Sequence, residues 1–552
     1  MSRDHEVARG AGVVGGATMV SRVLGLVREQ VMATLFGAGL ATDAFNVAFR
    51  IPNLLRDLFA EGAMSSAFVP TFTAERAGHG DAAALDFARR LMVALVSLLA
   101  ALCAVGWIAA PALVRLFAPG FDAVPGKLEL TVTLTRIMLP FLPAVALAAA
   151  AMGVLNAYGR FAVPALAPAF LNLGMVVGGL ALLPVCRAFG VPAITAMAWG
   201  VVIGGFLQFA VQLPALHGVG FRFTGPPAAP AAPAPERRPR GLHPGIRRVA
   251  TMMVPATIGL AATQINLLVT TIIASVLDQG SVSWLWYAFR LMQLPIGVFG
   301  VALATVSLPA LSRAAVAGDR EALKSTLSAA LRLLALLTIP AGAWLAALAS
   351  PVVALLYEHG RFGPHDTTQT AGALAAYAVG LPAFAAVGVL TRAFYALGET
   401  RIPVIASFVA VALNLALNLL FVGPLAFLGL GHLGLALATS LTSIANAGQL
   451  AFYLRRRIGP IEGGRIAGTA LRVAAAAAFA LAPCALALRA LGGRWHAGWG
   501  PELATVAAGA LAALAFGWFA LRALRVEELA ALESLAASVA RRLGLGGRAP
   551  RA

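Results

Sequence analysis

The same short sequence patterns occur twice in this chain, about 240 positions apart. The Ala-Phe-Arg of Ala48–Arg50 recurs at Ala288–Arg290. Further pairs keep nearly the same spacing: Val69–Pro70 and Leu308–Pro309, Gly80–Asp81 and Gly318–Asp319, Phe117–Phe121 and Tyr357–Phe362, Gly159 and Gly398, Pro164 and Pro403. Each match alone is of chance level, but a nearly constant offset indicates an internal duplication. In an apolar chain such a duplication is typical of transporters, whose site lies between the repeats.

The composition places most of the chain in a lipid bilayer. Of its 552 residues, 60% are hydrophobic and 12% are charged, and the mean hydropathy is +0.85. Soluble proteins carry roughly 25% charged residues. Helices are the expected spanning elements, because lipid cannot satisfy free backbone amides, and the short alternating segments of a membrane barrel are missing from the sequence. We therefore expect an all-α integral membrane protein with about 14 transmembrane helices. The predicted spans are 10–37, 42–73, 88–116, 128–157, 162–186, 193–217, 247–277, 282–312, 325–356, 367–397, 402–423, 429–454, 466–489 and 502–524.

The duplication and the spans together predict the domain organisation. Six spans is an even number, so both repeats start on the same side of the membrane and form two six-helix lobes related as parallel repeats. The Pro-rich segment between them favours extended polyproline II and predicts a linker. The predicted parts are an N-lobe at 10–220, a cytoplasmic Pro/Arg-rich linker at 221–246, a C-lobe at 247–456, two further helices at 466–524 and a cytoplasmic basic tail at 526–552.

The net charge of +18 follows the orientation of the helices rather than an affinity for nucleic acid. With both termini in the cytoplasm, the inner loops and tails hold about 26 of the 41 Lys and Arg residues, and the outer loops hold about 6. The polar N-terminus has no signal-peptide pattern, so we expect the first helix to remain in the mature protein. The three cysteines are too dispersed for a disulfide framework or a CxxC metal motif. Neither a P-loop nor an HExxH motif occurs, so the sequence favours a transporter over an ATPase or a metalloprotease.

The second span carries a polar stripe with the period of a helix. Its members are Asp43, Asn46, Arg50, Asn53, Asp57 and Glu61. Pro52 interrupts the stripe and removes a backbone hydrogen bond, which is typical of helices that line a cavity or move as a gate. Arg56 lies off the ideal stripe, although a kink at Pro52 would turn it inward. The spacing alone leaves open whether Arg50 or Arg56 faces the cavity.

Arginines also occur in the first span and in the second repeat. Arg22 and Glu29 share one helix face, whereas Ser21, Gly25 and Arg28 lie on another. Each arginine at the bilayer centre costs roughly 2.5–3.5 kcal/mol, so a cluster of them indicates a function. The nearby acids are too few to neutralise all of these charges, and a planar guanidinium suits phosphate oxygens. Two structural alternatives remain: Arg22 pairs with Glu29 or Asp43, and arginines near span ends extend to the membrane surface. Those span-end arginines are Arg136, Arg332, Arg392 and Arg472.

At these residues the chain resembles the MurJ family, also called MviN, of lipid II flippases within the multidrug/oligosaccharidyl-lipid/polysaccharide exporter superfamily. The resemblance rests on Ser21–Gly25, Arg28, Phe36–Gly39, Thr42–Phe45, Pro52–Arg56 and Phe59–Gly62, and it continues through Phe299–Leu303 to the last two spans. It implies two lobes arranged in a V, a cationic cavity that faces the cytoplasm, and a hydrophobic groove at the last two helices for the undecaprenyl tail. The implied partner is lipid II in the bacterial inner membrane, with cell-wall synthesis proteins as possible further partners and no cofactor.

The resemblance also assigns roles to particular residues. Arg22, Arg28, Arg56 and Arg290 match the family's important arginines, and Asp43 matches its important aspartate. Arg28, Arg56 and Arg290 would face the pyrophosphate, which favours Arg56 over Arg50. We expect gating or supporting roles for Ser21, Gly25, Glu29, Pro52, Asn53 and Glu61.

Two departures from the family pattern bear on coupling to an ion. Phe289 stands before Arg290, where some relatives carry an acid. A sodium site in the second lobe of some relatives uses acidic ligands, whereas the matching region here offers the neutral candidates Asn266, Asn414 and Asn418. The sequence therefore predicts no metal site.

Other functions compatible with the sequence are also testable. An exporter of another prenyl-linked saccharide would share the cationic cavity, whereas a cation-coupled drug exporter would need a buried carboxylate in a mostly neutral cavity. A membrane enzyme acting on prenyl pyrophosphates would need acidic metal-binding residues in a loop. A non-transporting scaffold for wall synthesis would tolerate loss of the buried arginines.

Overall fold

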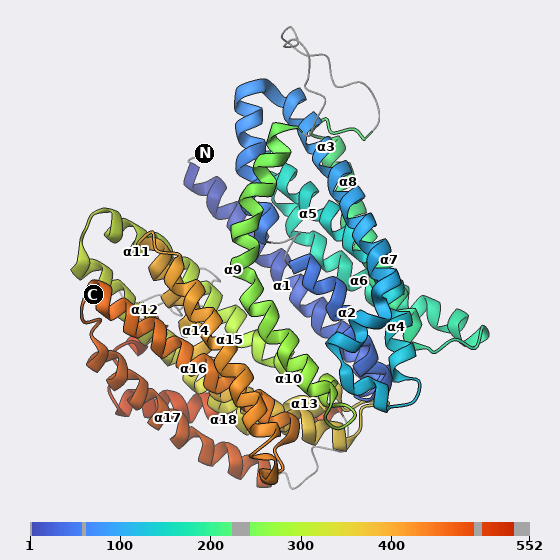
Figure 1. Ribbon diagram of the computed structural model, residues 1–552. Helices are drawn as coiled ribbons and strands as arrows, with labels where there is room; N and C mark the ends of the chain where they lie inside the picture. The colour runs from blue at the N-terminus through green and yellow to red at the C-terminus, as the bar shows by residue number, and fades with distance from the viewer. Residues whose placement is uncertain (1–2, 58–61, 224–242, 491–498, 531, 535–552) are drawn as a thin grey trace. The chain divides into compact units, whose positions relative to one another are not determined.

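The computed structural model describes the chain except for residues 1–2, 58–61, 224–242, 491–498, 531 and 535–552 (Figure 1). The described residues are mainly helical, so the prediction of an all-α protein is confirmed. Most of the predicted linker and most of the basic tail lie outside the described residues.

Each predicted span overlaps one helix or two consecutive helices, and the helix at Gly62–Phe117 overlaps both the second and the third span. The helices of the first part are α1 (Arg3–Phe36), α2 (Leu40–Arg56), α3 (Gly62–Phe117), α4 (Lys127–Met138), α5 (Phe141–Ala157), α6 (Ala162–Ala188), α7 (Ile194–Ala210), α8 (Leu213–His217) and α9 (Pro244–Ser275). Those of the second part are α10 (Ser281–Pro295), α11 (Val301–Val316), α12 (Arg320–Ala347), α13 (Ala349–Tyr357), α14 (Pro364–Ala396), α15 (Arg401–Val422), α16 (Gly431–Ile458), α17 (Gly463–Ala490) and α18 (Trp499–Ala523). Short 3₁₀- or π-helical segments connect some of them.

Nine helical segments within the described residues are long and apolar enough to cross a membrane. They are Ala67–Phe117, Lys127–Ala157, Ala162–Ala188, Ile194–His217, Arg320–Ala347, Pro364–Ala396, Arg401–Val422, Gly463–Pro483 and Trp499–Ala523. The helices with the arginines of interest, α1, α2 and α10, lie outside this set. The total of fourteen spans therefore remains a prediction.

The chain packs into two compact units, Met1–Ser283 and Trp284–Ala552. The division falls inside α10, about 40 residues after the linker, because α9 packs along α3 in the first unit (Figure 1). The repeat pattern groups α9 with the second copy, whereas the packing groups it with the first. The predicted lobes, 10–220 and 247–456, follow the sequence repeat rather than the packing, and their boundaries stay a prediction.

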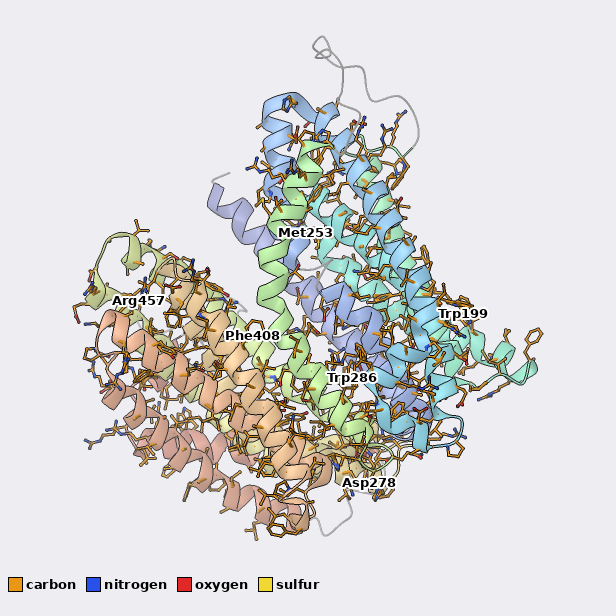
Figure 2. All side chains as sticks on the ribbon, viewed as in Figure 1. Trp199, Met253, Asp278, Trp286, Phe408 and Arg457 are labelled. Atoms are coloured by element: carbon orange, nitrogen blue, oxygen red, sulfur yellow. The ribbon has the colours of Figure 1, made fainter. Side chains whose placement is uncertain are left out.

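Unit 1 is built around a core of aromatic and small side chains from α3 and α5. Phe68, Phe72 and Phe87 are fully buried in this core, and Met253 of α9 packs against it (Figure 2). Within α3, Gly80 has a φ of 83°, which favours glycine, and the helix direction changes there. This break lies between the second and third predicted spans, 42–73 and 88–116.

Unit 2 has one core between α12, α14 and α16 and another that joins α12 to the last two helices. The two added helices, α17 and α18, pack on one another and α17 packs on α12. Gly517 of α18 allows close contact, because a Cβ there would lie 2.9 Å from the Trp344 ring. Large apolar side chains face outward in both units; Trp199 and Phe408, labelled in Figure 2, are 46% and 40% exposed. Such exposed apolar surface is what a lipid-facing helix presents.

Candidate functional site

Asp43 lies in the first turn of α2 and is the centre of a buried charged network. A carboxylate is favourable there, because the N-terminus of a helix carries a partial positive charge. Its Oδ2 accepts hydrogen bonds from Nζ of Lys127, at 2.8 Å, and from the backbone N–H of Gly280, at 2.9 Å. The side chains of Asp43 and Lys127 are 2% and 3% exposed, so this is a buried ion pair.

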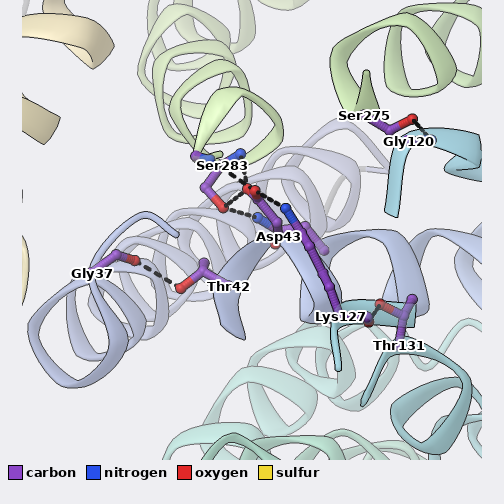
Figure 3. Close-up of polar contacts among 10 residues, drawn as sticks. Gly37, Thr42, Asp43, Gly120, Lys127, Thr131, Ser275 and Ser283 are labelled. Atoms are coloured by element: carbon purple, nitrogen blue, oxygen red, sulfur yellow. Dashed lines mark hydrogen bonds and ion pairs between the residues drawn. The ribbon is translucent and has the colours of Figure 1, made fainter. Parts of the chain in front are cut away.

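Ser283, in the first turn of α10, completes this network (Figure 3). Its backbone N–H and its hydroxyl donate to Oδ1 of Asp43 at 3.0 and 2.6 Å. Asn46, one turn further along α2, donates to the Ser283 hydroxyl oxygen at 3.3 Å. Four donors from three segments therefore hold the Asp43 carboxylate. This geometry suits a group that ties α2 and α4 to the start of α10, and direct contact of Asp43 with substrate remains a prediction.

A close backbone contact supports the same region of unit 1. The turn after α3 approaches the end of α9 so closely that a Cβ on Gly120 would lie 2.2 Å from the carbonyl oxygen of Ser275. The Gly120 N–H also donates to the Ser275 hydroxyl at 3.3 Å (Figure 3). In the same turn, the Phe121 ring lies 4.1 Å from the Lys127 ammonium, at the range of a cation–π interaction.

Arg28 lies in α1 and its guanidinium is buried against α6. It forms an ion pair with the neighbouring Glu29, and it donates to Oδ1 of Asn172 at 3.1 Å. A longer contact of 3.6 Å reaches the sulfur of Met175. The Asn172 amide in turn donates to the carbonyl oxygen of Ser21 at 3.2 Å. One asparagine of α6 thus links two turns of α1 and orients Arg28.

The small residues of α1 lie at this contact between helices. A Cβ on Gly25 would lie 3.8 Å from the Asn172 amide nitrogen, which is ordinary van der Waals contact. Arg22 is half-buried six residues before Arg28. The supporting roles predicted for Ser21 and Gly25 remain predictions, although both contribute to the surroundings of Asn172.

Arg56 is the last residue of α2 and pairs with the residue that follows it. Its Nε and Nη2 donate to Oδ1 of Asp57 at 3.1 and 2.7 Å. The other oxygen of Asp57 accepts from Asn53 at 3.3 Å and from Gln264 of α9 at 3.1 Å. Pro52 is buried inside α2, which continues as a helix to Arg56. Arg50 is half-buried, so the choice between Arg50 and Arg56 still rests on the resemblance.

The remaining predicted site residues belong to unit 2 or fall outside the described residues. Arg290 belongs to unit 2, where its guanidinium carbon lies 5.3 Å from the centre of the Trp286 ring on α10. Trp286 is labelled in Figure 2. Its proximity to Arg28 and Arg56 remains a prediction. Glu61 falls outside the described residues.

A buried polar cluster joins α15 to α16 in the region where the resemblance implies sodium. The Asn418 amide donates to Oδ1 of Asn414 at 2.8 Å, and Asn414 contacts the hydroxyls of Thr439 and Thr442 at 3.5 Å. These groups are neutral, so the set does not match the acidic ligands that the resemblance implies. In the described part of the chain, His, Cys, Asp and Glu side chains form no group of three placed to hold a metal ion.

Two of the span-end arginines make specific contacts. Arg136 donates to the carbonyl oxygen of Trp107 at 3.1 Å and stacks over its ring at 4.5 Å. Arg332 of α12 forms an ion pair with Glu528 at 2.8 Å, and its side chain is 16% exposed. Arg332 is therefore held by a carboxylate beyond α18, and its position at the membrane surface stays a prediction.

The sequence reasoning did not single out four partners of these charged residues. They are Lys127, Asn172, Gln264 and Ser283. Two of them were recognisable in the sequence as unusual polar residues. Lys127 is one of only two lysines in the chain, and Asn172 is an isolated amide in an apolar span. Ser283 stands 240 residues after Asp43, at the repeat offset, and a search of repeat-equivalent positions would have found it.

The fold and these charged clusters define the chain as a polytopic helical membrane protein with the repeat pattern of a transporter. The model of the family "Lipid II flippase MurJ" matches residues 32–505. The lipid II flippase MurJ of Burkholderia cenocepacia is 40% identical over 445 residues, which cover 80% of this chain and 83% of the relative. A probable lipid II flippase MurJ of Rhizobium meliloti is 39% identical over 421 residues, which cover 76% of each chain. This chain therefore belongs to the MurJ family.

Solved structures agree with this assignment. The lipid II flippase MurJ in an inward closed conformation superimposes with a TM-score of 0.73 at 27% identity, over 93% of this chain and 99% of that one. An inward-facing multidrug transporter of the MATE family has a TM-score of 0.65 at 15% identity, over 82% and 99%. The second likeness shows a shared fold alone.

Proposed function

We propose that this protein moves lipid II from the inner to the outer leaflet of the bacterial cytoplasmic membrane, as a transporter without chemistry on its substrate. The main support is membership of a family whose curated relative, 40% identical, is named a lipid II flippase. The arginines of α1 and α2 give the proposal its chemistry, since guanidinium groups bind diphosphate oxygens in a bidentate manner. An exporter of another prenyl-linked saccharide is not favoured, because the curated relatives share the lipid II assignment.

In the proposed mechanism, the substrate headgroup enters a cavity that is open to the cytoplasm. Arg28, Arg56 and Arg290 replace water around the diphosphate, and Arg22 adds positive charge nearby. Binding neutralises this positive charge, which allows the cytoplasmic side to close and the outer side to open. A membrane potential is worth about 2.3 kcal/mol per charge per 100 mV and would help to reset the empty cationic carrier.

The Asp43 network supplies the outer latch in this mechanism. With both termini in the cytoplasm, α1 runs outward and α2 starts near the outer surface, so the network lies at the outer ends of α2, α4 and α10. While it is intact, these helix ends stay together and the outer side stays closed. Release of the headgroup outward requires that the bonds to Ser283 and Gly280 break.

The prenyl tail has a separate place in the proposal. We assign it to lipid and to the surface of α17 and α18, whose exposed side chains are large and apolar, among them Leu511, Phe516 and Phe519. Contact of the tail's methylene groups with these side chains or with lipid keeps its apolar surface out of water. Proteins of cell-wall synthesis are the natural partners of the released product.

The experiment is complementation of bacteria that are depleted of their own lipid II flippase. The wild-type chain should restore growth and prevent the accumulation of lipid II in the inner leaflet. Arg290→Ala should fail to do so while inserting into the membrane at the wild-type level. Normal growth on Arg290→Ala as the only flippase would contradict the proposed role of the arginines.

A further inference from the structure

Each of the two arginines predicted to bind diphosphate in unit 1 pairs with the acid directly after it in the sequence. Arg28 pairs with Glu29 and Arg56 pairs with Asp57. Successive side chains on a helix point about 100° apart and do not normally face each other. The Arg56 pair lies at the C-terminal end of α2, where Asp57 is the cap residue. This arrangement places a carboxylate where a phosphate oxygen would bind.

Asp57 is fixed in place by neutral groups as well as by the arginine. Nε and Nη2 of Arg56 donate to Oδ1, whereas Oδ2 accepts from Asn53 and from Gln264. Asn53 belongs to α2 and Gln264 to α9, so two helices hold the carboxylate at the guanidinium. Loss of the ion pair with Arg56 would therefore leave Asp57 with donors for its second oxygen.

The Arg56 pair is also the more accessible of the two. The side chains of Arg56 and Asp57 are 19% and 21% exposed, whereas those of Arg28 and Glu29 are 7% and 6% exposed. An incoming anion thus meets Arg56 with its carboxylate already in place, and it must compete with that carboxylate for the guanidinium.

We propose that Asp57 is a resident counter-ion on Arg56 that excludes phospholipids carrying a single phosphodiester charge and yields to the two charges of a diphosphate. The proposal rests on the proposed function and adds a specificity-determining residue to it. Anionic phospholipids are abundant in bilayers, and an uncovered cationic cavity would bind them. The Asp57 carboxylate repels every negative charge of a ligand. A diphosphate still binds, because its two charges can interact with several arginines at once, whereas a single phosphodiester charge cannot.

The test measures lipid II binding by the purified full-length chain in nanodiscs of phosphatidylcholine, with and without phosphatidylglycerol. For each variant, the quantity compared is the ratio of its own Kd values in the two lipid mixtures. The wild-type ratio should stay near one. In Asp57→Asn the ratio should rise about fivefold, equivalent to about 1 kcal/mol, because phosphatidylglycerol then competes at Arg56.

Matched variants locate the effect. Asp57→Glu keeps the charge and should keep the wild-type ratio. Asp86→Asn removes another arginine-paired acid of the same unit, held by Arg89 and Arg90, and should also keep it. Adding Arg56→Gln to Asp57→Asn should abolish the sensitivity to phosphatidylglycerol.

Two results separate the possible failures. An Asp57→Asn ratio equal to the wild-type ratio would overturn the role of Asp57 while leaving lipid II transport intact. Absence of lipid II binding by the wild-type chain would instead overturn the proposed function. If Asp57→Asn does not fold, Gln264→Leu replaces it: loosening Asp57 should raise the ratio, and an unchanged ratio would contradict the proposal.

Discussion

Asp43 and Ser283, which stand 240 residues apart and occupy equivalent positions of the two repeats, are hydrogen-bonded to each other at 2.6 Å. Equivalent residues of parallel repeats meet only close to the axis that relates the repeats. The contact therefore identifies the N-terminal turns of α2 and α10 as a place where the duplicated sequence contacts itself. The duplication has diverged there, since one copy carries the acid and the other the hydroxyl that binds it.

Lys127→Met should destabilise the protein by about 3–5 kcal/mol, because it leaves Asp43 buried without its counter-ion. Thermal or denaturant unfolding of the purified chain in detergent would measure the loss. Asp43→Asn should cost a similar amount by leaving the Lys127 ammonium unpaired.

The double variant provides the control for this pair. Asp43→Asn combined with Lys127→Met removes both charges. Its loss of unfolding free energy should be smaller than the sum of the two single losses by more than about 1 kcal/mol. Strictly additive losses would show that the two side chains do not interact, contrary to the ion pair described here.

Gly120→Ala should lower stability by about 1–3 kcal/mol, because its Cβ would lie 2.2 Å from the carbonyl oxygen of Ser275 and backbone must move. Gly78→Ala is the matched control, since a Cβ on Gly78 of α3 meets no atom within 4 Å. In a helix this control should be neutral or stabilise by roughly 0.5–1 kcal/mol. Equal melting temperatures for the two variants would contradict the close approach of the turn to α9.

Arg332→Gln should cost about 3 kcal/mol by leaving Glu528 largely buried without its partner, and it should weaken the attachment of the segment after α18 to α12. Thr469 of α17 contacts the same carboxylate at 3.4 Å, so the contact joins three segments. Limited proteolysis and thermal unfolding would report the loss.

The neighbouring acid is a matched control for this contact. Glu527 is 72% exposed and lies 3.7 Å from Arg332, so Glu527→Gln should change stability by less than about 0.5 kcal/mol. An equal effect of Glu527→Gln and Glu528→Gln would rule out the specific pairing.

The periodic features of the fold were predictable from the sequence, whereas the partners of the charged residues mostly were not. Apolar runs predicted the helices and their approximate ends. The stripe of α2 placed Asn46 and Asp43 on one face, and both contact Ser283. The grouping of α9 with unit 1 depends on packing between distant segments, which helical periodicity does not encode.

The contacts of the predicted arginines likewise could not be read from helical periodicity. Sequence spacing puts Glu29 beside Arg28 in the chain but on a different helix face, so their ion pair was not foreseen. Asn172 of α6 and Gln264 of α9 are far away in the sequence, and only the packing of helices brings them to Arg28 and Asp57. Residue type selected the candidate side chains, whereas tertiary structure determines what they contact.

Stability should fall in acid through Glu462, in the turn before α17. The Ser328 hydroxyl lowers the pKa of Glu462 below its ordinary 4.5, against the opposing effect of burial, and Arg465 and Arg332 lower it further. A lowered pKa in the folded state stabilises the protein above pH 4.5, and this contribution is lost as the pH falls through the folded-state value. The difference in Tm between wild type and Glu462→Gln should therefore shrink below pH 4.5. A difference that is constant across this range would contradict the prediction.

Transport of fluorescent lipid II across the membrane of proteoliposomes tests the central claim most directly. The wild-type chain should expose lipid II on the opposite leaflet, whereas Arg28→Gln, Arg56→Gln and Arg290→Ala should each lose most of this activity. Asp86→Asn, reconstituted to the same density, should retain it. Wild-type transport rates in all three arginine variants would contradict an account in which these guanidinium groups bind the diphosphate.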